Sequence, residues 1–409
     1  MKLLLSAPSH LLIRESIQIT GSKSESNRLL LLQALYPNIT IGNLSNSDDA
    51  EVMHAGLQES TGTVDIHHAG TAMRFLTSYF ATQEGKEVIL TGSQRMTERP
   101  IKVLVEALQD LGANIKYQKR EGFPPIKIKG RKLRQDKVSL PADISSQYIS
   151  ALLLVAPSLE KGIQLELKGK ITSVPYIKMT LSLLDQIGIA TSFEGNMITV
   201  GQKKTVRDQK LMVESDWSSA SYFYSITALS HLGTEIALSS YKENSLQGDS
   251  VLAEIYTGLG VETIFDENRI ILKRTKNPKP EIVNLELSNA PDLAQTIAVT
   301  CFGLGMGCRL TGLHTLKIKE TDRLEALYKE LSKLGANISV THEELILRPS
   351  AQIIPGVAIA TYNDHRMAMA FAPLALKTDI IINNAEVVSK SYPDFWKDLK
   401  KLHFGIEEC

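Results

Sequence analysis

Residues 104–117 read LVEALQDLGANIKY, and residues 327–340 read LYKELSKLGANISV. Each stretch has apolar residues at helical spacing, reaches a Gly of the kind that ends helices, and continues as a short alternating run typical of a strand. Two more stretches have the same form, LSLLDQIGIATSF at 181–193 and LAEIYTGLGVETIF at 252–265. Their central glycines lie 76, 72 and 75 residues apart along the chain. This regularity predicts a structural repeat of about 75 residues.

The same pattern extends towards both ends of the chain. LKKLHFGIEE places Gly405 70 residues after Gly335, whereas MHAGLQES places Gly56 only 56 residues before Gly112. A second series of stretches has the same period. In each of its members, small or polar residues precede an apolar stretch of helical length, and the six members are at Ser24, Gly70, Ser145, Asp216, Asp292 and Asp364. Both series predict six units, the first about 20 residues short. We expect an α/β fold with two helices per unit and strands between them, and two domains of three units for 409 residues.

Composition excludes several classes of protein. Lys plus Arg and Asp plus Glu number 45 each, so no overall positive field exists to hold nucleic acid or an anionic membrane. The three cysteines form no zinc or CxxC pattern, and no apolar run reaches the roughly 18 residues of a membrane span. These features predict a cytoplasmic protein without nucleic-acid, membrane or metal partners. The linker-like stretch RTKNPKPEI at 274–282 is interpreted as a surface loop.

Motifs at predicted helix starts in the first half combine cations with hydroxyl groups and glycines. They are GSKSESNR at 21–28, AGTAMR at 69–74, QRMTERP at 94–100 and SSQY at 145–148. Helix N-termini, hydroxyls, Lys and Arg together favour bound anions, and a guanidinium fork suits phosphate or carboxylate. Taken one at a time, ordinary helix capping explains each motif equally well.

In the second half of the chain, the predicted helix starts carry more charged residues. KIKETDRL at 317–324 has five charges in eight residues before an amphipathic helix, and a capping box explains only one or two of its carboxylates. Asp292, Asp364-His365-Arg366 and the lysine of SKSYP at 389–393 mark further helix starts. If these ends converge, they form a cleft for substrates with several phosphate or carboxylate groups. Asp292 and Glu320 are then available for proton transfer.

Taken together, these motifs resemble those of the 5-enolpyruvylshikimate-3-phosphate synthase family, in family order from Gly21 to Phe395. The resemblance rests on GSKSESNR, AGTAMR, QRMTERP, SSQY, SDWSSASYF, NSLQGD, PDLAQTIA, KIKETDRL, YNDHRMAMAF and SKSYPDF. It implies a two-domain inside-out α/β barrel of six βαβαββ repeats, here with the first repeat shortened. It also implies that the N-terminal strand returns to the second domain, so that the domains are 1–19 with 217–409, and 20–216.

The resemblance further implies the reaction. The 5-hydroxyl of shikimate 3-phosphate attacks C2 of phosphoenolpyruvate while C3 is protonated, and phosphate leaves; no cofactor or metal is implied, and the family is usually monomeric. Asp292 would take the hydroxyl proton, Glu320 would act at C3 and Lys23 would assist the leaving phosphate. The implied phosphoenolpyruvate ligands are Lys23, Gly70, Arg95, Gln147, Arg323, Arg366 and Lys390. The implied shikimate 3-phosphate ligands are Lys23, Ser24, Arg28, Ser145, Ser146, Gln147, Ser173, Tyr176, Asp292 and Lys319.

Three positions depart from the family pattern: His68 and Thr315 replace Asn, and Phe75 replaces Pro. We expect the chemistry to survive because the charged positions are retained, and we expect affinity and sensitivity to glyphosate, the family's inhibitor, to differ. Two alternatives remain at this point. One is the sister transferase that acts on UDP-N-acetylglucosamine, which has Lys-Asn in place of Lys23-Ser24 and a cysteine in its first half. The other is a non-catalytic binding protein of the same fold.

Overall fold

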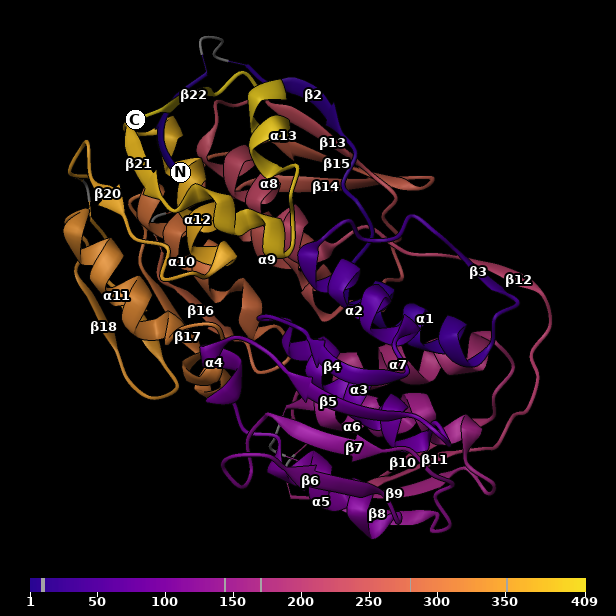
Figure 1. Cartoon of the computed structure of the whole chain (residues 1–409). Helices are drawn as coiled ribbons and strands as arrows, with labels where there is room; N and C mark the ends of the chain where they lie inside the picture. Colours follow the sequence, from indigo (N-terminus) through magenta and orange to yellow (C-terminus); the bar gives the residue numbers. More distant parts are fainter. Residues whose placement is uncertain (9–11, 143–144, 170, 280, 351) are drawn as a thin grey trace. The chain divides into compact units, whose positions relative to one another are not determined.

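The computed structural model describes residues 1–8, 12–142, 145–169, 171–279, 281–350 and 352–409. Internal contacts divide the chain into two units, coloured by sequence in Figure 1. The internal unit is Gly21–Val213, and the terminal unit is Met1–Thr20 together with Glu214–Cys409. The sequence-based domain boundaries, after residues 19 and 216, lie within three residues of these limits. That the units are the family's domains stays a prediction.

Five four-stranded sheets share one topology, which confirms the repeats. The first two strands are parallel, the second and third antiparallel, and the third and fourth antiparallel, so each sheet is mixed. In the internal unit the sheets are β4(Thr61–Asp65)-β5(Glu87–Thr91)-β7(Ile126–Lys129)-β6(Asn114–Tyr117) and β8(Lys137–Pro141)-β9(Ile163–Lys168)-β11(Met197–Val200)-β10(Thr191–Glu194). In the terminal unit they are β2(Arg14–Ile17)-β13(Glu235–Ser239)-β15(Arg269–Arg274)-β14(Val261–Asp266), β16(Val283–Glu286)-β17(Cys308–Thr311)-β19(Leu345–Leu347)-β18(Ile338–Val340) and β20(Ala358–Ile359)-β21(Ile380–Asn383)-β1(Lys2–Ser6)-β22(Gly405–Glu408).

The sheet of the first repeat has two strands only. β3 (Ile39–Gly42) and β12 (Gln209–Met212) form a parallel pair, which corresponds to the first two strands of the other sheets. Helix α2 (Asp48–Gln58) is followed almost at once by β4, whereas a hairpin such as β6–β7 follows the equivalent helix of the next repeat. The predicted shortening is therefore confirmed, and the missing part is the hairpin.

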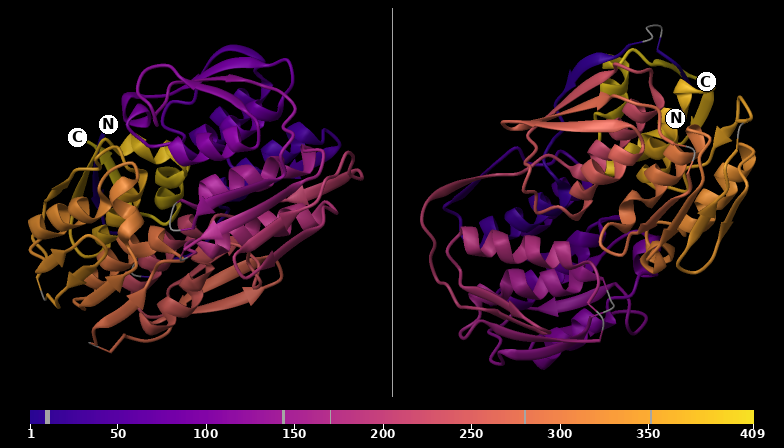
Figure 2. Two further views of the ribbon diagram at one scale, coloured as in Figure 1. Left: turned by 90° about the horizontal axis from the view of Figure 1, so that it is seen from below. Right: turned by 180° about the vertical axis from the view of Figure 1, so that it is seen from behind.

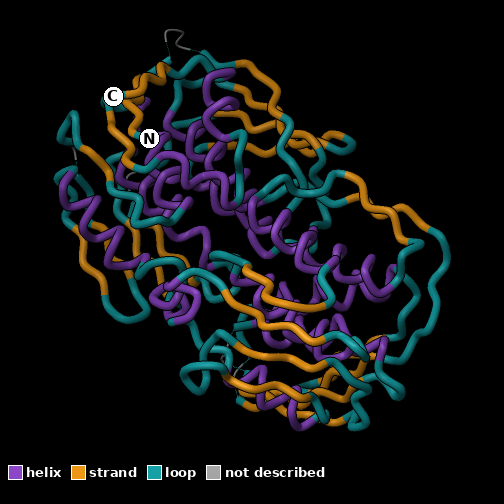
Figure 3. The backbone as a smooth tube through the Cα atoms, viewed as in Figure 1, coloured by secondary structure: helices purple, strands orange, loops and turns teal. Residues whose placement is uncertain are grey.

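Two kinds of helix alternate along the chain. The first kind is buried nearly all round and packs against the same kind in its own unit: α1 (Lys23–Leu35), α3 (Gly70–Thr82) and α6 (Ser146–Val155), and α8 (Trp217–Leu229), α10 (Ala294–Gly303) and α12 (His365–Phe371). In α8, for example, every residue except Ser218 is buried. The second kind has exposed residues as well as buried ones, and it comprises α2, α5 (Lys102–Asp110), α7 (Val174–Gln186), α9 (Leu252–Gly258), α11 (Arg323–Lys333) and α13 (Phe395–Lys401). Figure 3 shows strands beside the helices of each unit, and the strand faces that carry buried Ile, Leu and Val pack towards the helices of the first kind.

The helix-ending glycines behave as the sequence predicts in four repeats and differently in two. Gly112, Gly188, Gly260 and Gly335 all have positive φ and follow α5, α7, α9 and α11. In the last repeat the left-handed residue after α13 is His403, at φ 65°, while Gly405 begins β22. In the first repeat Gly56 lies inside α2, because no hairpin turn follows that helix. The period was therefore right, although two of its six markers do not cap a helix.

The N-terminal segment is part of the terminal unit. Strand β1 lies between β21 and β22 and is antiparallel to both, and β2 pairs with β13. The two termini accordingly lie beside one another in both views of Figure 2. Strand β2 ends at Ile17, and the residues between it and GSKSESNR continue as coil, with Thr20 O accepting from Asp216 N. None of the described helices is long and apolar enough to cross a membrane.

Candidate active site

Three helix starts of the terminal unit bring acids and cations together. Helix α12 is capped by Asp364, whose carboxylate accepts from Arg366 N, and α11 begins at Arg323 after the cap Asp322. Asp292 lies in the 3₁₀ turn η3 (Pro291–Leu293) that leads into α10. Because α8, α10 and α12 pack together, their starts also lie together, which is why residues far apart in sequence meet here.

Arg323 is the centre of this group and is 2% exposed. Its Nε donates to Asp364 Oδ2 at 2.6 Å, Nη1 to Asp292 Oδ1 at 2.8 Å and Nη2 to Glu320 Oε2 at 2.7 Å. One guanidinium thus holds three carboxylates, using the planar fork that makes Arg suited to such contacts. Burial disfavours the charge of Arg323, but Asp364, Glu320 and Asp292 outweigh that effect and raise its pKa.

Asp292 is the second point of convergence. Arg366 Nη2 donates to Asp292 Oδ2 at 3.1 Å, and Lys319 Nζ lies 3.5 Å from Asp292 Oδ1. Burial alone would raise the pKa of Asp292, but the charges of Arg366, Lys319 and Arg323 hold it well below the ordinary value. Asp292 is therefore a carboxylate that stays ionised as long as these cations remain beside it.

Arg366 also links Asp292 to a fourth acid. Its Nη2 donates to Ser218 Oγ at 3.2 Å, and the Ser218 hydroxyl donates to Asp249. Burial, followed by the charge of Asp292, raises the pKa of Asp249 to about 6. Two acids of one group thus have their pKa values moved in opposite directions, an arrangement common at sites of proton transfer.

Lys390 lies next to the start of α12. It ends the 3₁₀ segment η6 (Ala385–Lys390), and its Nζ donates to Asn363 O at 2.6 Å. The structure therefore brings together six of the predicted site residues, all within the terminal unit: Asp292, Lys319, Glu320, Arg323, Arg366 and Lys390.

In the internal unit, Lys23 opens α1 and pairs with an acid that the sequence analysis did not select. Its Nζ lies 3.1 Å from Asp49 Oδ2, near the start of α2. His68 Nε2, where the family usually has Asn, lies 3.8 Å from the other oxygen of Asp49. Asp49 thus sits between the two basic side chains and orients the Lys23 ammonium.

Arg28 is one turn further into α1 and is 3% exposed. Its Nε donates to Thr180 Oγ1 at 2.8 Å, Nη1 to Ser24 O at 2.7 Å and Nη2 to Ser150 Oγ at 3.0 Å. Phe75, the second departure from the family pattern, lies 5.5 Å from this guanidinium in cation–π geometry. Burial lowers the pKa of Arg28 to about 10. The group remains charged near neutral pH although its hydrogen-bond acceptors carry no charge.

Gly70 opens α3 and has a guanidinium against it. A Cβ at Gly70 would lie 2.6 Å from Nη1 of Arg99, so only Gly lets that side chain approach the helix start. Arg95 is half exposed, and its Nη1 lies 3.3 Å from Glu98 Oε2. Gln147 Nε2 donates to Thr71 Oγ1 at 3.2 Å, which places Gln147 at the same helix start.

The remaining predicted residues of the internal unit lie at two helix starts. Ser145 caps α6 by accepting from Gln147 N, and Ser146 is the first residue of that helix. Ser173 precedes α7 in a left-handed conformation, at φ 53°, and its carbonyl accepts from Tyr176 N at 3.1 Å. Tyr176 O in turn accepts from Arg28 Nη2 at 3.4 Å, which ties this helix start to α1.

Comparison with known proteins agrees with this geometry. The profile of the family described as EPSP synthase (3-phosphoshikimate 1-carboxyvinyltransferase) matches residues 58–399. A 3-phosphoshikimate 1-carboxyvinyltransferase of Bacteroides fragilis strain YCH46 is 46% identical over 413 residues, which cover 100% of this chain and 99% of the relative. The chain belongs to the EPSP synthase family. Its activity is therefore that of a 3-phosphoshikimate 1-carboxyvinyltransferase, in the shikimate pathway.

Further comparisons extend the match within the family and to its fold. A 3-phosphoshikimate 1-carboxyvinyltransferase of Shewanella halifaxensis is 36% identical over 418 residues, which cover 95% of this chain and 96% of the relative. A solved EPSP synthase from Acinetobacter baumannii superimposes with a TM-score of 0.80 over 100% of both chains at 20% identity. The predicted EPSP synthase fold is thereby confirmed.

Several residues that contact the predicted site of this EPSP synthase were missed as site residues. They are Asp49, Arg99, Ser218, Asp249 and Asp364. All lie in or beside motifs at helix starts, so the signal that selected Asp292 was also present at these positions. Among the described residues, no group of three or more His, Cys, Asp or Glu could hold a metal ion.

Proposed function

We propose that the acid and cation groups of both units carry out the enolpyruvyl transfer, with the residue roles that the family resemblance implies. The observation that carries this proposal is the network in which Arg323 holds Asp292, Glu320 and Asp364 while Arg366 and Lys319 also contact Asp292. Such a network supplies a base, an acid and cations for phosphate and carboxylate within one helix-start cluster.

In the proposed reaction, Asp292 accepts the proton of the 5-hydroxyl of shikimate 3-phosphate, and the oxygen of that hydroxyl forms a bond to C2 of phosphoenolpyruvate. Protonated Glu320 delivers a proton to C3, which gives a tetrahedral intermediate. Glu320 then takes a proton back from C3 as the C2–O bond to phosphate breaks, and the enol ether forms. Lys23, oriented by Asp49, stabilises the departing phosphate. The proton that Asp292 took from the hydroxyl ends on this phosphate, which leaves as hydrogen phosphate, so both acids return to their starting states.

The charge balance of the terminal unit explains how Asp292 would gain basicity at the right moment. Without substrates, its negative charge is neutralised by Arg323, Arg366 and Lys319, which makes Asp292 a weak base. The carboxylate and phosphate groups of the substrates compete for the same cations. Their binding raises the pKa of Asp292 towards its ordinary value, so the base becomes effective when the substrates are present.

We propose the substrate contacts in the internal unit in the same way. Lys23, Ser24, Arg28, Ser145, Ser146, Gln147, Ser173 and Tyr176 are proposed for shikimate 3-phosphate, and Lys23, Gly70, Arg95 and Gln147 for phosphoenolpyruvate. To the second set we add Arg99, because its guanidinium lies at Gly70 whereas that of Arg95 pairs with Glu98. Lys319 and Asp292 complete the shikimate 3-phosphate ligands, and Arg323, Arg366 and Lys390 the phosphoenolpyruvate ligands.

The two alternatives do not fit equally well. Family membership and the retained Lys23-Ser24 pair speak against an enzyme of UDP-N-acetylglucosamine. A non-catalytic protein would have no need of the buried Arg323 network, which places Asp292 and Glu320 on one guanidinium.

We further propose that the enzyme acts as a monomer in the cytoplasm. We also propose altered affinity for glyphosate, because His68 contacts Asp49 and Phe75 contacts Arg28 where the family has other residues.

The test is phosphate release by the purified protein with shikimate 3-phosphate and phosphoenolpyruvate, given singly and together. Release should require both substrates. Asp292→Asn and Glu320→Gln, which keep side-chain volume, should each lower kcat by about 10²–10³-fold. Glu344→Gln, a matched change at an ion pair on the same unit's surface, should leave kcat unchanged. Full activity in either site variant would contradict the assigned roles, and binding of both substrates without phosphate release would support the non-catalytic alternative.

A further inference from the structure

A second cationic pocket lies in the terminal unit, away from the helix starts described above. It has a volume of about 630 Å³ and is lined at the far ends of α8 and α10, by Ser230 and His231 and by Gly303 to Met306. Helices α8 and α10 begin near Ser218 and Asp292, and 13 and 10 residues correspond to about 20 Å and 15 Å of helix. The pocket is therefore separate from the Arg323 cluster.

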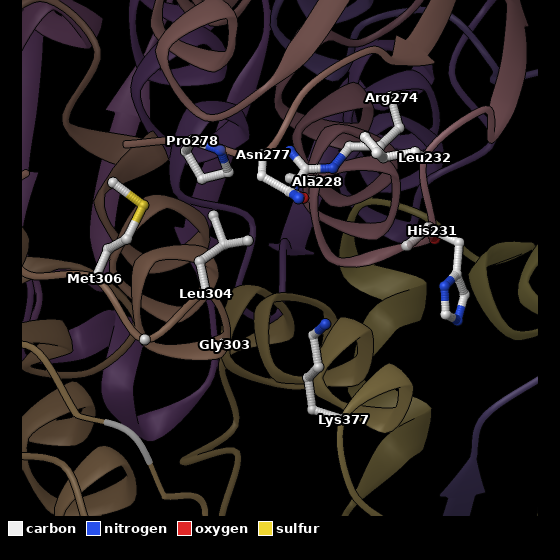
Figure 4. A pocket seen from close by; sticks show the side chains of 12 residues that line it. Ala228, His231, Leu232, Arg274, Asn277, Pro278, Gly303, Leu304, Met306 and Lys377 are labelled. Atoms are coloured by element: carbon white, nitrogen blue, oxygen red, sulfur yellow. The ribbon is translucent and has the colours of Figure 1, made fainter. Parts of the chain in front are cut away.

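Two cations point into this pocket, as Figure 4 shows. Arg274, at the end of β15, is 4% exposed and contributes its guanidinium. Lys377 is exposed at the mouth, and its ammonium is directed towards the side of the pocket that holds Arg274 and Asn277. The loop after Arg274 adds Lys276 and Lys279, so this region has a local positive excess in a chain whose overall charge is zero.

Neither Arg274 nor Lys377 has an acidic partner among the described residues. Partial desolvation and the charge of Arg274 both lower the pKa of Lys377, and no carboxylate acts against them. Burial likewise lowers the pKa of Arg274. Two neighbouring cations without an acid raise each other's free energy, and a bound anion would remove that cost.

Helix capping explains these cations only in part. Arg274 Nη1 donates to the carbonyl of Leu259, the C-cap of α9, and Nη2 donates to Asn277 Oδ1 at 3.5 Å, but the buried Nε has no hydrogen-bond partner. The last carbonyls of α10 already accept from the N–H groups of Leu304, Gly305 and Met306. The carbonyl of Ile226 near the end of α8 accepts from both the N–H and the hydroxyl of Ser230. No hydrogen bond among the described residues joins the Lys377 ammonium to either helix end.

We propose that this pocket binds a small amphipathic organic anion, with one carboxylate or phosphate group held between Arg274 and Lys377. The rest of the wall fixes the chemistry of the remainder of the ligand. It is mixed: the apolar side chains of Ala228, Leu232, Pro278, Leu304 and Met306 lie beside the polar Ser230, His231 and Asn277. A ring or short hydrocarbon group against these side chains would bury apolar area, while the charged group satisfies the guanidinium.

The probe for this site is 4-iodobenzoate, which combines a carboxylate, a ring and an anomalous scatterer. Titration calorimetry would compare the full chain with Lys377→Gln and with Lys276→Gln, a control that removes the same charge outside the pocket wall. Lys377→Gln should weaken binding about 5–10-fold, because one charge-assisted contact at an exposed site is lost. Lys276→Gln should change the affinity less than about twofold. In crystals soaked with the probe, the iodine should lie against Leu304 or Pro278.

Four results would overturn the proposal. They are an equal loss of affinity in both variants, equally tight binding of uncharged 4-iodobenzyl alcohol, iodine density only outside the pocket, and density in crystals without binding in solution. Lys377 belongs to neither substrate cluster, so Lys377→Gln should keep the phosphate-release activity of the unaltered enzyme. Failure of this proposal can therefore be told apart from failure of the proposed function.

Discussion

Replacing Arg323 by Gln tests whether this guanidinium neutralises a buried cluster of acids. Arg323 is 2% exposed and bonds to Asp292, Glu320 and Asp364, and the side chain of Asp364 is fully buried. Removing one partner of a buried ion pair costs about 3–5 kcal/mol, because the remaining charge is left without compensation. We expect a loss of that size at pH 7. Arg323→Lys, which keeps a charge without the fork, should lose about half as much.

The loss of stability in Arg323→Gln should depend on pH in a definite direction. In the unaltered enzyme the depressed pKa of Asp292 contributes stability above pH 3.8, which is lost as the pH falls below that value. In Arg323→Gln one of the three cations beside Asp292 is lost while Arg366 and Lys319 remain, so the pKa of Asp292 is lowered less. The variant therefore has less of this stability to lose as the pH falls, and the difference between variant and unaltered enzyme should shrink below pH 3.8.

The assay can be confined to the relevant unit. Both tryptophans, Trp217 and Trp396, belong to the terminal unit, so their fluorescence during guanidinium chloride unfolding reports that unit alone. Arg309→Gln is the matched control, because Arg309 is 56% exposed and pairs with Glu344 at the surface; its loss should stay below about 1 kcal/mol. A loss below about 1 kcal/mol in Arg323→Gln at pH 7, or a difference from the unaltered enzyme that does not shrink below pH 3.8, would refute the reasoning.

Three further predictions concern single groups. With a native pKa of about 6, Asp249 lowers the stability of the fold as the pH rises from about 4 to 6, and Asp249→Asn should abolish this decrease. At pH 7 the free energy of unfolding, followed by tryptophan fluorescence, should rise by about 1–2 kcal/mol. An unchanged pH profile would contradict the raised pKa. Gly70→Ala should keep the melting temperature, because the Arg99 guanidinium can move, and should raise KM for phosphoenolpyruvate about tenfold in steady-state kinetics; an unchanged KM would exclude a contact at this helix start. Lys23→Met should lower kcat about 10²–10³-fold in the phosphate-release assay while Asp49 loses its cation, and a change confined to KM would leave Lys23 a binding residue only.

Much of the fold was predictable because the repeats leave a periodic signal. Four helix-ending glycines at intervals of 72 to 76 residues reflect a backbone need for positive φ that few other residues meet. The short first repeat was visible as a missing stretch of sequence, and the structure identifies it as the absent hairpin after α2. What the pattern could not supply was strand pairing across the chain, such as β3 with β12, because register depends on contacts distant in sequence.

The site was less predictable than the fold. Charged helix starts were visible, but a capping acid and a site acid look alike in sequence, so Asp364 was interpreted only as a helix start. Its carboxylate does cap α12 and at the same time holds Arg323, and only the packing of α10 against both α12 and α11 reveals the second role. In the same way QRMTERP contains two arginines, and the sequence does not show that Arg95 lies within the short helix α4 (Gln94–Thr97) while Arg99, after it, approaches Gly70.

The buried arginines at the helix starts of the two units are compensated in opposite ways, and this difference suggests how the work is divided. In the internal unit, every described hydrogen bond of the Arg28 and Arg74 guanidinium groups goes to an uncharged acceptor, such as Thr180 Oγ1 or Gly70 O. Their positive charges therefore extend into the surroundings and favour phosphate or carboxylate groups. At the helix starts of the terminal unit, Arg323 and Arg366 are matched by acids, so little net field remains there and the proton affinity of each acid depends on how its cations are occupied. An anion that displaces Asp292 from these cations would change its pKa directly, whereas an anion near Arg28 would be held without altering a proton. The internal unit is thus suited to anchoring substrate charge, and the terminal unit to coupling that charge to proton transfer.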